Sequence, residues 1–139
     1  MSDFTVSLTI KPEKIAGLMI SAIESGDPVT TAARGGWCAG IYAGSEADDP
    51  PGSTEEHGPW YANPDYWARD FTVEIIEVDD ERTGHTIAHR IGRAQIISGL
   101  QVMVSKFPIH FANAVSDDDD AETADIFLQC VCFGELRYG

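Results

Sequence analysis

The chain has 139 residues and a formal net charge of −14, from 9 Lys and Arg against 23 Asp and Glu. A field of this sign repels phosphate backbones and anionic lipids, so we expect no direct binding to nucleic acid and none to membranes. The 43% share of hydrophobic residues argues against disorder, and three cysteines, an odd number, argue against a secreted disulfide scaffold. We see neither a signal peptide nor an apolar run of membrane-spanning length. We therefore expect one acidic, cytosolic domain spanning residues 1–139.

The first half of the chain predicts strands around one helix, followed by a loop. Alternating apolar side chains predict a half-buried strand over residues 4–10, and helically spaced apolar side chains after Pro12 predict a helix over residues 12–25. Residues 29–43 mix β-forming residues with glycine, which predicts one or two short strands. Residues 46–65 contain four prolines and six acids, so we expect a long acidic surface loop there.

The second half begins with a predicted hairpin. Residues 70–79 alternate until the parity changes at Ile76, which predicts a bulged strand. A turn-forming segment follows, and residues 86–91 fit the returning strand.

Helices are predicted to complete the chain. One is expected over residues 93–106, with a short helical or irregular piece at 109–115. Residues 121–133 fit a helix with Asp120 as its N-cap, although residues 126–133 also fit a buried strand.

Together these elements predict an α+β fold. The expected architecture is a small antiparallel sheet covered on one face by about three helices. The strands are expected at residues 4–10, 29–43, 70–79 and 86–91, and the helices at residues 12–25, 93–106 and 121–133.

No motif in the sequence indicates catalysis. His85 and His89 have the spacing of paired metal ligands but lack a third, so we interpret them as solvent-facing hairpin residues. The three cysteines do not fit a zinc knuckle and are interpreted as small buried hydrophobic residues. The aspartates at 117–120 lack the glycine and the glutamate of a calcium loop. We therefore expect no enzymatic activity, no catalytic residues, no metal and no cofactor.

Three stretches concentrate the negative charge. Residues 46–56 hold five acids, residues 70–81 hold six and residues 117–125 hold six, and none of the stretches contains Lys or Arg. Folded together, they would spread carboxylates at spacings comparable to a phosphate backbone and fit a basic channel. The alternative is a highly soluble surface without a partner. The residues expected to bind a partner are Asp48, Asp49, Glu55, Glu56, Asp117, Asp118, Asp119 and Asp120.

Aromatic residues are dense around the predicted loop, and all three tryptophans lie between residues 37 and 67. Such side chains stack on bases, and an arginine at a helix start favours bound phosphate. An oligomer that holds a nucleotide is therefore a second hypothesis. A simpler interpretation is that the aromatic residues pin the loop to the core. The residues of this alternative ligand site are Trp37, Trp60, Trp67, Arg90 and Arg93.

Motifs at both ends of the chain resemble a family of small phage and prophage proteins. Residues 20–26 (ISAIESG), residues 120–129 (DAETADIFLQ) and the tail at 133–139 (FGELRYG) are similar to that family's segments ALEGG…YW, DAxTADxxxQ and FGExxYG. The chain departs from the first segment at Ser25, where the family has glycine. The loop at 46–65 lies outside the resemblance, which carries over no active-site residues.

The resemblance implies a phage origin, and small acidic phage proteins are often inhibitors of host defence. We therefore expect a non-enzymatic inhibitor of anti-CRISPR or anti-restriction type that acts in the host cytoplasm. Its partner would be a host defence protein complex, bound at a basic nucleic-acid-handling surface through the acidic patches. The alternatives are an oligomeric sponge for a nucleotide defence signal and a structural or assembly accessory protein that self-associates.

Overall fold

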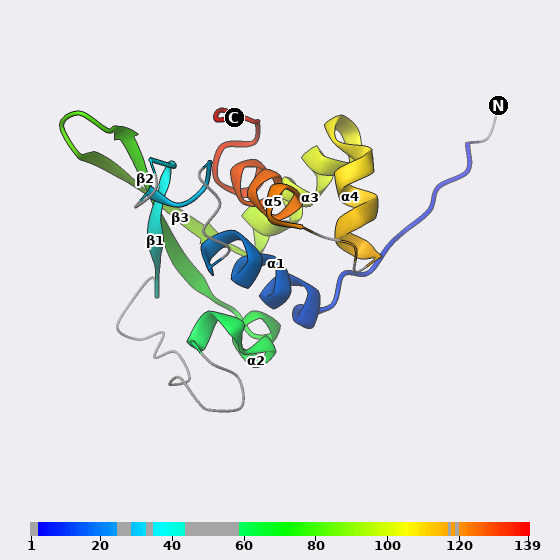
Figure 1. Ribbon diagram of the computed structural model, residues 1–139. Helices are drawn as coiled ribbons and strands as arrows, with labels where there is room; N and C mark the ends of the chain where they lie inside the picture. The colour runs from blue at the N-terminus through cyan, green and yellow to red at the C-terminus, as the bar shows by residue number, and fades with distance from the viewer. Residues whose placement is uncertain (1–2, 25–28, 33–34, 44–58, 117, 119) are drawn as a thin grey trace.

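The computed structural model describes residues 3–24, 29–32, 35–43, 59–116, 118 and 120–139. Figure 1 shows the strands on one side of the molecule and most of the helices gathered on the other, so the α+β class is confirmed. The elements are α1 (Pro12–Glu24), β1 (Cys38–Ala43), the 3-10 helix η2 (Trp60–Ala62), α2 (Pro64–Ala68), β2 (Thr72–Asp80), β3 (His85–Gly92), α3 (Arg93–Lys106), α4 (Pro108–Val115) and α5 (Ala121–Phe133).

The strand β2 is the centre of a three-stranded antiparallel sheet with the order β1-β2-β3. Val73 of β2 pairs with Ala43 on one side and with Ile91 on the other. Every second residue from Val73 to Glu77 is buried, as the alternation predicted. The strand is bulged as predicted, but not at Ile76, because Glu77 takes the next inward position and the register with β3 shifts between Val78 and Asp80.

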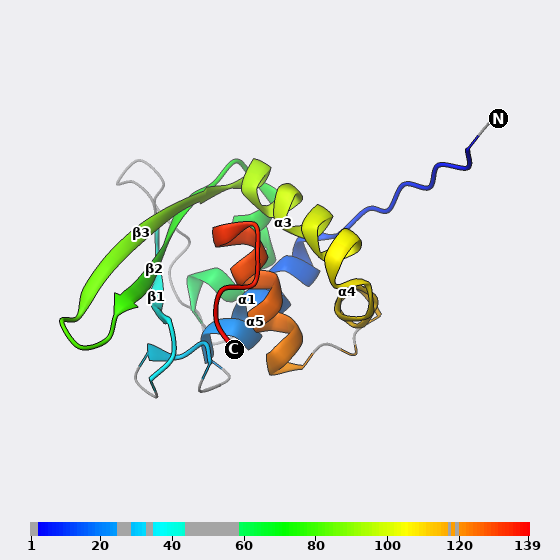
Figure 2. The same cartoon turned by 90° about the horizontal axis from the view of Figure 1, so that it is seen from above.

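The helix α5 lies at the centre of the helical layer. Nine consecutive residues, from Thr123 to Val131, are buried, and α1, α3 and α4 all pack against it (Figure 2). Asp120 caps the helix as predicted, since its carboxylate accepts a hydrogen bond from the Thr123 amide at 2.8 Å. Gly134 ends the helix with a φ of 70°, a left-handed conformation that glycine adopts without strain. The helix over residues 121–133 is therefore confirmed, and the strand alternative is wrong.

Residues 4–10 do not form the expected strand. They belong to neither a helix nor a strand, and Figures 1 and 2 show this segment running away from the body past α4. Alternating apolar side chains favour an extended backbone, but a strand also needs a neighbour to complete its hydrogen bonds. No strand of the described residues lies beside this segment. The adjoining helix is confirmed over Pro12–Glu24.

The predicted loop at 46–65 is wrong at its C-terminal end. Residues 46–58 lie outside the described residues, but the segment after them folds into η2 and α2. Pro64 begins α2, because proline at a first helical position has no N–H that needs a partner. The Asn63 side chain caps the helix by accepting a hydrogen bond from the Asp65 amide at 3.0 Å. Between residues 29 and 43, the structure has β1 and an isolated bridge from Thr31 to Cys38.

Candidate functional site

The structure describes two of the eight acidic residues that were expected to bind a partner. Asp118 and Asp120 are both exposed, next to the start of α5. The hydrogen bond from the Thr123 amide lowers the pKa of Asp120, so this carboxylate stays charged while it caps the helix. The other six lie outside the described residues: Asp48, Asp49, Glu55, Glu56, Asp117 and Asp119.

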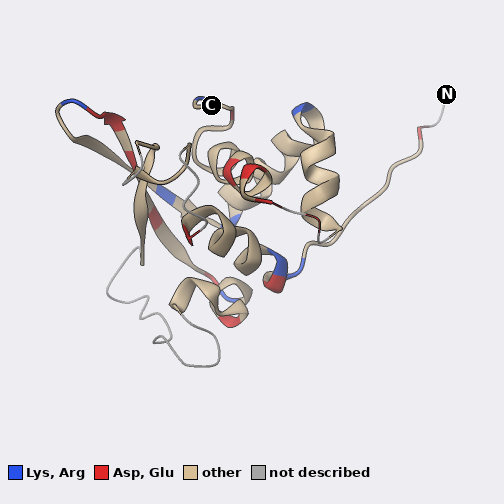
Figure 3. Ribbon diagram, viewed as in Figure 1, with Lys and Arg blue, Asp and Glu red and all other residues tan. Residues whose placement is uncertain are grey.

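Most of the described carboxylates lie at the molecular surface. Among the described Asp and Glu residues, only Glu77 and Asp125 are buried. The charge is also distributed unevenly, because the 35 residues from Arg82 to Ser116 contain no Asp or Glu. These residues, called here the acid-free region, include β3, α3 and α4. Figure 3 shows acidic segments at the end of β2 and at the starts of α1 and α5, and none along the acid-free region.

The structure does not bring the alternative ligand-site residues together. Trp37 and Trp67 are core residues, 1% and 2% exposed, and they pack in different places. The Trp37 ring contacts the rings of Phe133 and Tyr138, whereas Trp67 contacts Phe71. Rings buried in this way have little surface left for stacking on a nucleotide.

Of the other three residues of that set, Arg93 contacts Trp67 only at its backbone carbonyl, and Trp60 shares the neighbour Tyr66 with Trp67. Trp60 is half-buried and packs edge-on against Tyr66, with the ring centroids 4.8 Å apart. Arg90 is exposed on β3, whereas Nη2 of Arg93 donates to the carbonyl oxygens of Trp67 and Arg69, both at 3.1 Å. These contacts support the interpretation that the aromatic residues pin their segment to the core.

Asp125, in the segment DAETADIFLQ at residues 120–129, lies in a buried polar network. Its Oδ1 accepts hydrogen bonds from Thr30 Oγ1 at 2.7 Å and from Trp37 Nε1 at 2.9 Å, and its Oδ2 accepts one from Gln129 Nε2 at 2.8 Å. All three neighbours donate, so the arrangement fits an ionised carboxylate. The motif residue therefore ties α5 to the chain around β1.

Gln129 extends this network to the C-terminal tail. Its Oε1 accepts the backbone amides of Arg137 and Tyr138, each at 2.9 Å, and its Nε2 also donates to the Tyr138 carbonyl at 3.1 Å. These backbone contacts fix the orientation of the Gln129 amide and hold the tail against α5. The motif residues Asp125, Gln129 and Tyr138 thus have a structural role in this fold.

Glu77 is a second buried carboxylate, and periodicity alone did not identify it. It accepts a hydrogen bond from the Tyr138 hydroxyl, contacts His89 Nε2 at 2.8 Å and lies 3.6 Å from Arg137 Nη1. Burial by itself raises the pKa of Glu77, but the bonds and charges of these neighbours outweigh it and lower the pKa. Burial and the Glu77 carboxylate together raise the pKa of Tyr138 to about 12. In the sequence, the signal that could have identified Glu77 is its place among the inward-facing positions of an alternating strand.

The histidines and cysteines form no metal site among the described residues, where no cluster of three or more metal-ligating side chains is found. His85 is exposed and pairs with Asp79 at 2.6 Å, but His89 is half-buried against Glu77, so the expectation that both face solvent is wrong for His89. The cysteines are free thiols, and burial raises the pKa of Cys38 and of Cys130 to about 11. These thiols are therefore poor nucleophiles at neutral pH.

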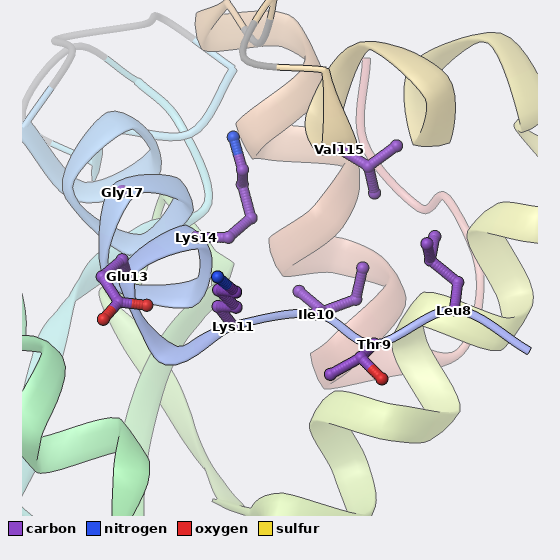
Figure 4. Close-up of a pocket in the computed structure, with 8 residues that line it drawn as sticks. All are labelled: Leu8, Thr9, Ile10, Lys11, Glu13, Lys14, Gly17 and Val115. Atoms are coloured by element: carbon purple, nitrogen blue, oxygen red, sulfur yellow. The ribbon is translucent and has the colours of Figure 1, made fainter.

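Two hollows flank the extended N-terminal segment, residues 3–11, which we call the arm. One, of about 750 Å³, separates the arm from α3 and is lined mainly by apolar side chains, with Arg93 at its edge. The other, of about 590 Å³, lies between the arm, the first turns of α1 and Val115. In Figure 4, Leu8 and Ile10 point from the arm toward the side on which Val115 lies. The arm thus borders both hollows without filling either.

No described helix is both long enough and apolar enough to cross a bilayer. Comparison of the chain with protein-family models, with curated proteins and with solved structures found no match.

Proposed function

We propose that this protein is a non-enzymatic inhibitor that binds a basic, nucleic-acid-handling surface of another protein, as a phage-encoded inhibitor of host defence would in the host cytoplasm. The proposal rests mainly on one observation: the chain has a net charge of −14, and most of its described carboxylates face outward. Among the described acids, only Glu77 and Asp125 are buried. Outward carboxylates would replace nucleic acid phosphates on the partner's Lys and Arg side chains.

The acidic run at residues 117–120 is the first segment to test. Asp118 and Asp120 are exposed beside the start of α5, outside both buried polar networks. Asparagine caps a helix about as well as aspartate does, so replacing all four aspartates by asparagine removes charge and keeps the cap. A change in binding would then report on charge rather than on folding.

The test is capture of nucleic-acid-processing proteins from host lysate on the tagged chain, at about 0.05 M and about 0.5 M salt. We expect salt, or an excess of duplex DNA, to release the retained complex. The Asp117–Asp120→Asn variant should retain at least about tenfold less of it. A control variant, Glu13→Gln with Asp65→Asn and Asp70→Asn, changes exposed acids elsewhere and should retain more than that variant.

One result would refute this function, and a second would refute the role of residues 117–120 in it. One is a retained complex that neither salt nor duplex DNA releases, because carboxylate mimicry of phosphate requires both. The other is full retention by the asparagine variant, which would remove residues 117–120 from the interface.

One further observation favours self-association, the property expected of an assembly accessory protein. The arm exposes apolar side chains beside an apolar hollow, and neither has a role in binding a basic surface.

A further inference from the structure

The arm carries apolar side chains that the molecule leaves in solvent. Phe4 is fully exposed, Val6 is 90% exposed and Leu8 is 61% exposed. They occupy alternate positions, so in an extended backbone they share one face, while Thr5, Ser7 and Thr9 occupy the other. An extended segment with one apolar face is suited to lie along an apolar surface, and burying these side chains would stabilise it.

An apolar surface of matching character lies beside the arm. The hollow of about 750 Å³ between the arm and α3 is called here the α3 groove. Ile97, Leu100 and Val104 line it from α3 at the spacing of one helical face. Ile97 and Val104 are each 50% exposed, so this stripe lacks a cover. The chain's own arm forms one wall of the groove, but its exposure shows that it does not fill it.

Charge indicates which partner can lie there. Two copies of a chain with net charge −14 repel each other wherever carboxylates meet, so an interface between copies must avoid them. No acid lines the α3 groove, whose α3 wall belongs to the acid-free region, and the arm carries one acid, Asp3, balanced by Lys11. The arm and the groove are thus among the few segments of this acidic chain that can approach a second copy without charge repulsion.

The length of the arm is also compatible with the length of α3. An extended segment of nine residues spans about 30 Å, and the 14 residues of α3 span about 21 Å. The arm is therefore long enough to leave one copy and follow α3 of another. Because every copy has one arm and one groove, a two-fold dimer satisfies both pairs at once.

We propose that the arm of one copy occupies the α3 groove of a second copy, and that the exchange is reciprocal in a two-fold symmetric dimer. Phe4, Val6 and Leu8 bury their shared face against Ile97, Leu100 and Val104 of the other chain. Asp118 and Asp120 do not line the α3 groove and remain available to a different partner.

The first experiment measures the mass of the full chain by analytical ultracentrifugation over a range of concentrations. We expect a dimer, and we expect Val6→Ser combined with Leu8→Ser to raise its dissociation constant at least about tenfold. Thr5→Ser, on the polar face of the arm, is the matched control and should leave that constant unchanged. A chain that stays monomeric at every concentration, or a dimer that Val6→Ser with Leu8→Ser leaves intact, would overturn the proposal.

The second experiment locates the arm by disulfide formation between two variants that each gain one cysteine. Val6→Cys mixed with Val104→Cys should form a cross-linked dimer under mild oxidation, while each variant alone should not. The native thiols of Cys38, Cys130 and Cys132 should not interfere, because burial raises the pKa of each of them. Ile87→Cys on β3, also exposed, is the control position. Cross-linking of Val6→Cys to itself, or to Ile87→Cys in place of Val104→Cys, would overturn the docking of the arm in the α3 groove.

The two proposals can fail separately. Salt screens the repulsion between two acidic copies, so it should leave the dimer intact or strengthen it. The same salt should weaken the binding of a basic partner. A monomeric chain that still binds a basic partner would overturn the dimer alone, and a dimer without such a partner would overturn the inhibitor alone.

Discussion

Asparagine at position 125 would test the buried network that joins α5 to the rest of the fold. The Asp125 carboxylate accepts from three donors, on Thr30, Trp37 and Gln129. Asp125→Asn keeps the oxygen that serves Thr30 and Trp37, but it places an NH₂ group opposite the Gln129 NH₂ group. Gln129 cannot turn its amide to relieve this conflict, because its oxygen accepts two backbone amides of the tail.

The loss of stability can be estimated by counting the buried hydrogen-bond donors that lose an acceptor. Asp125→Asn takes the acceptor from the Gln129 NH₂ group and adds a second unpaired NH₂ group opposite it, so we expect the free energy of unfolding to fall by about 2–6 kcal/mol. Asp125→Ala removes the acceptor of all three donors, which by the same reasoning costs about 3–9 kcal/mol. That loss is comparable to the whole stability of a typical domain, about 5–15 kcal/mol, so we expect Asp125→Ala to be largely unfolded.

The assay is urea unfolding followed by tryptophan fluorescence and by circular dichroism, whose transitions should coincide. Asp118→Asn makes the same chemical change at an exposed position and should stay within about 0.5 kcal/mol of the parent. A double-mutant cycle adds a second check. Thr30→Val should still cost stability in Asp125→Asn, because asparagine keeps the oxygen that Thr30 uses, but less than in the parent, because that oxygen is no longer charged. An Asp125→Asn protein as stable as the parent would refute the proposed arrangement of donors.

Three further predictions concern helix packing and pH. A Cβ on Gly99 would lie 2.6 Å from Val131 Cγ2 where α3 meets α5, so Gly99→Ala should cost about 1–3 kcal/mol in urea unfolding. Gly17→Ala, in α1 with open space around it, should instead stabilise the protein by about 0.5–1 kcal/mol, and equal effects would contradict this packing. The pKa of Glu77 is lowered from 4.5, so the stability that it contributes should be lost as the pH falls below 4.5, and Glu77→Gln should remove this dependence. The pKa of Tyr138 is raised from 10.0 to about 12, so its contribution should be complete below pH 10 and lost as the pH rises through 12.

The periodicity of apolar residues predicted the elements whose backbone hydrogen bonds are local in sequence. These are the longer helices and the hairpin, whose two strands are adjacent in the chain. The helices α1 and α3 bury one apolar stripe each, and a stripe of that kind is visible in the sequence, whereas α5 is buried on all its faces from Thr123 to Val131. The hairpin of β2 and β3 was predictable because its turn separates two short alternating runs. Residues 4–10 had the same alternation but no neighbouring strand, so pattern alone predicted a strand that does not form.

Local sequence patterns could not predict the contacts of the buried polar residues, because their partners are distant in sequence. Glu77 is bonded to Tyr138, 61 residues away, and Asp125 is bonded to Thr30, 95 residues away. An acid on an inward strand position indicates an unusual environment, but only the fold identifies the groups that compensate for its burial. The aromatic residues illustrate the same point, since a buried Trp37 and a ligand-stacking Trp37 have the same sequence signature.

The distribution of charge gives the two proposed interfaces opposite physical characters. The acidic segments can attract a basic partner only while their charge is unscreened, so that binding should weaken as salt rises. The arm and the α3 groove contain one acid between them and associate through apolar area, which salt does not weaken. Measured on one preparation, capture of a basic partner and the dimer dissociation constant should therefore respond to salt in different directions. If salt weakens both the capture of a basic partner and the dimer, then carboxylates also contribute to the dimer interface. The separation of the surface into acidic segments and an acid-free region would then have no functional meaning.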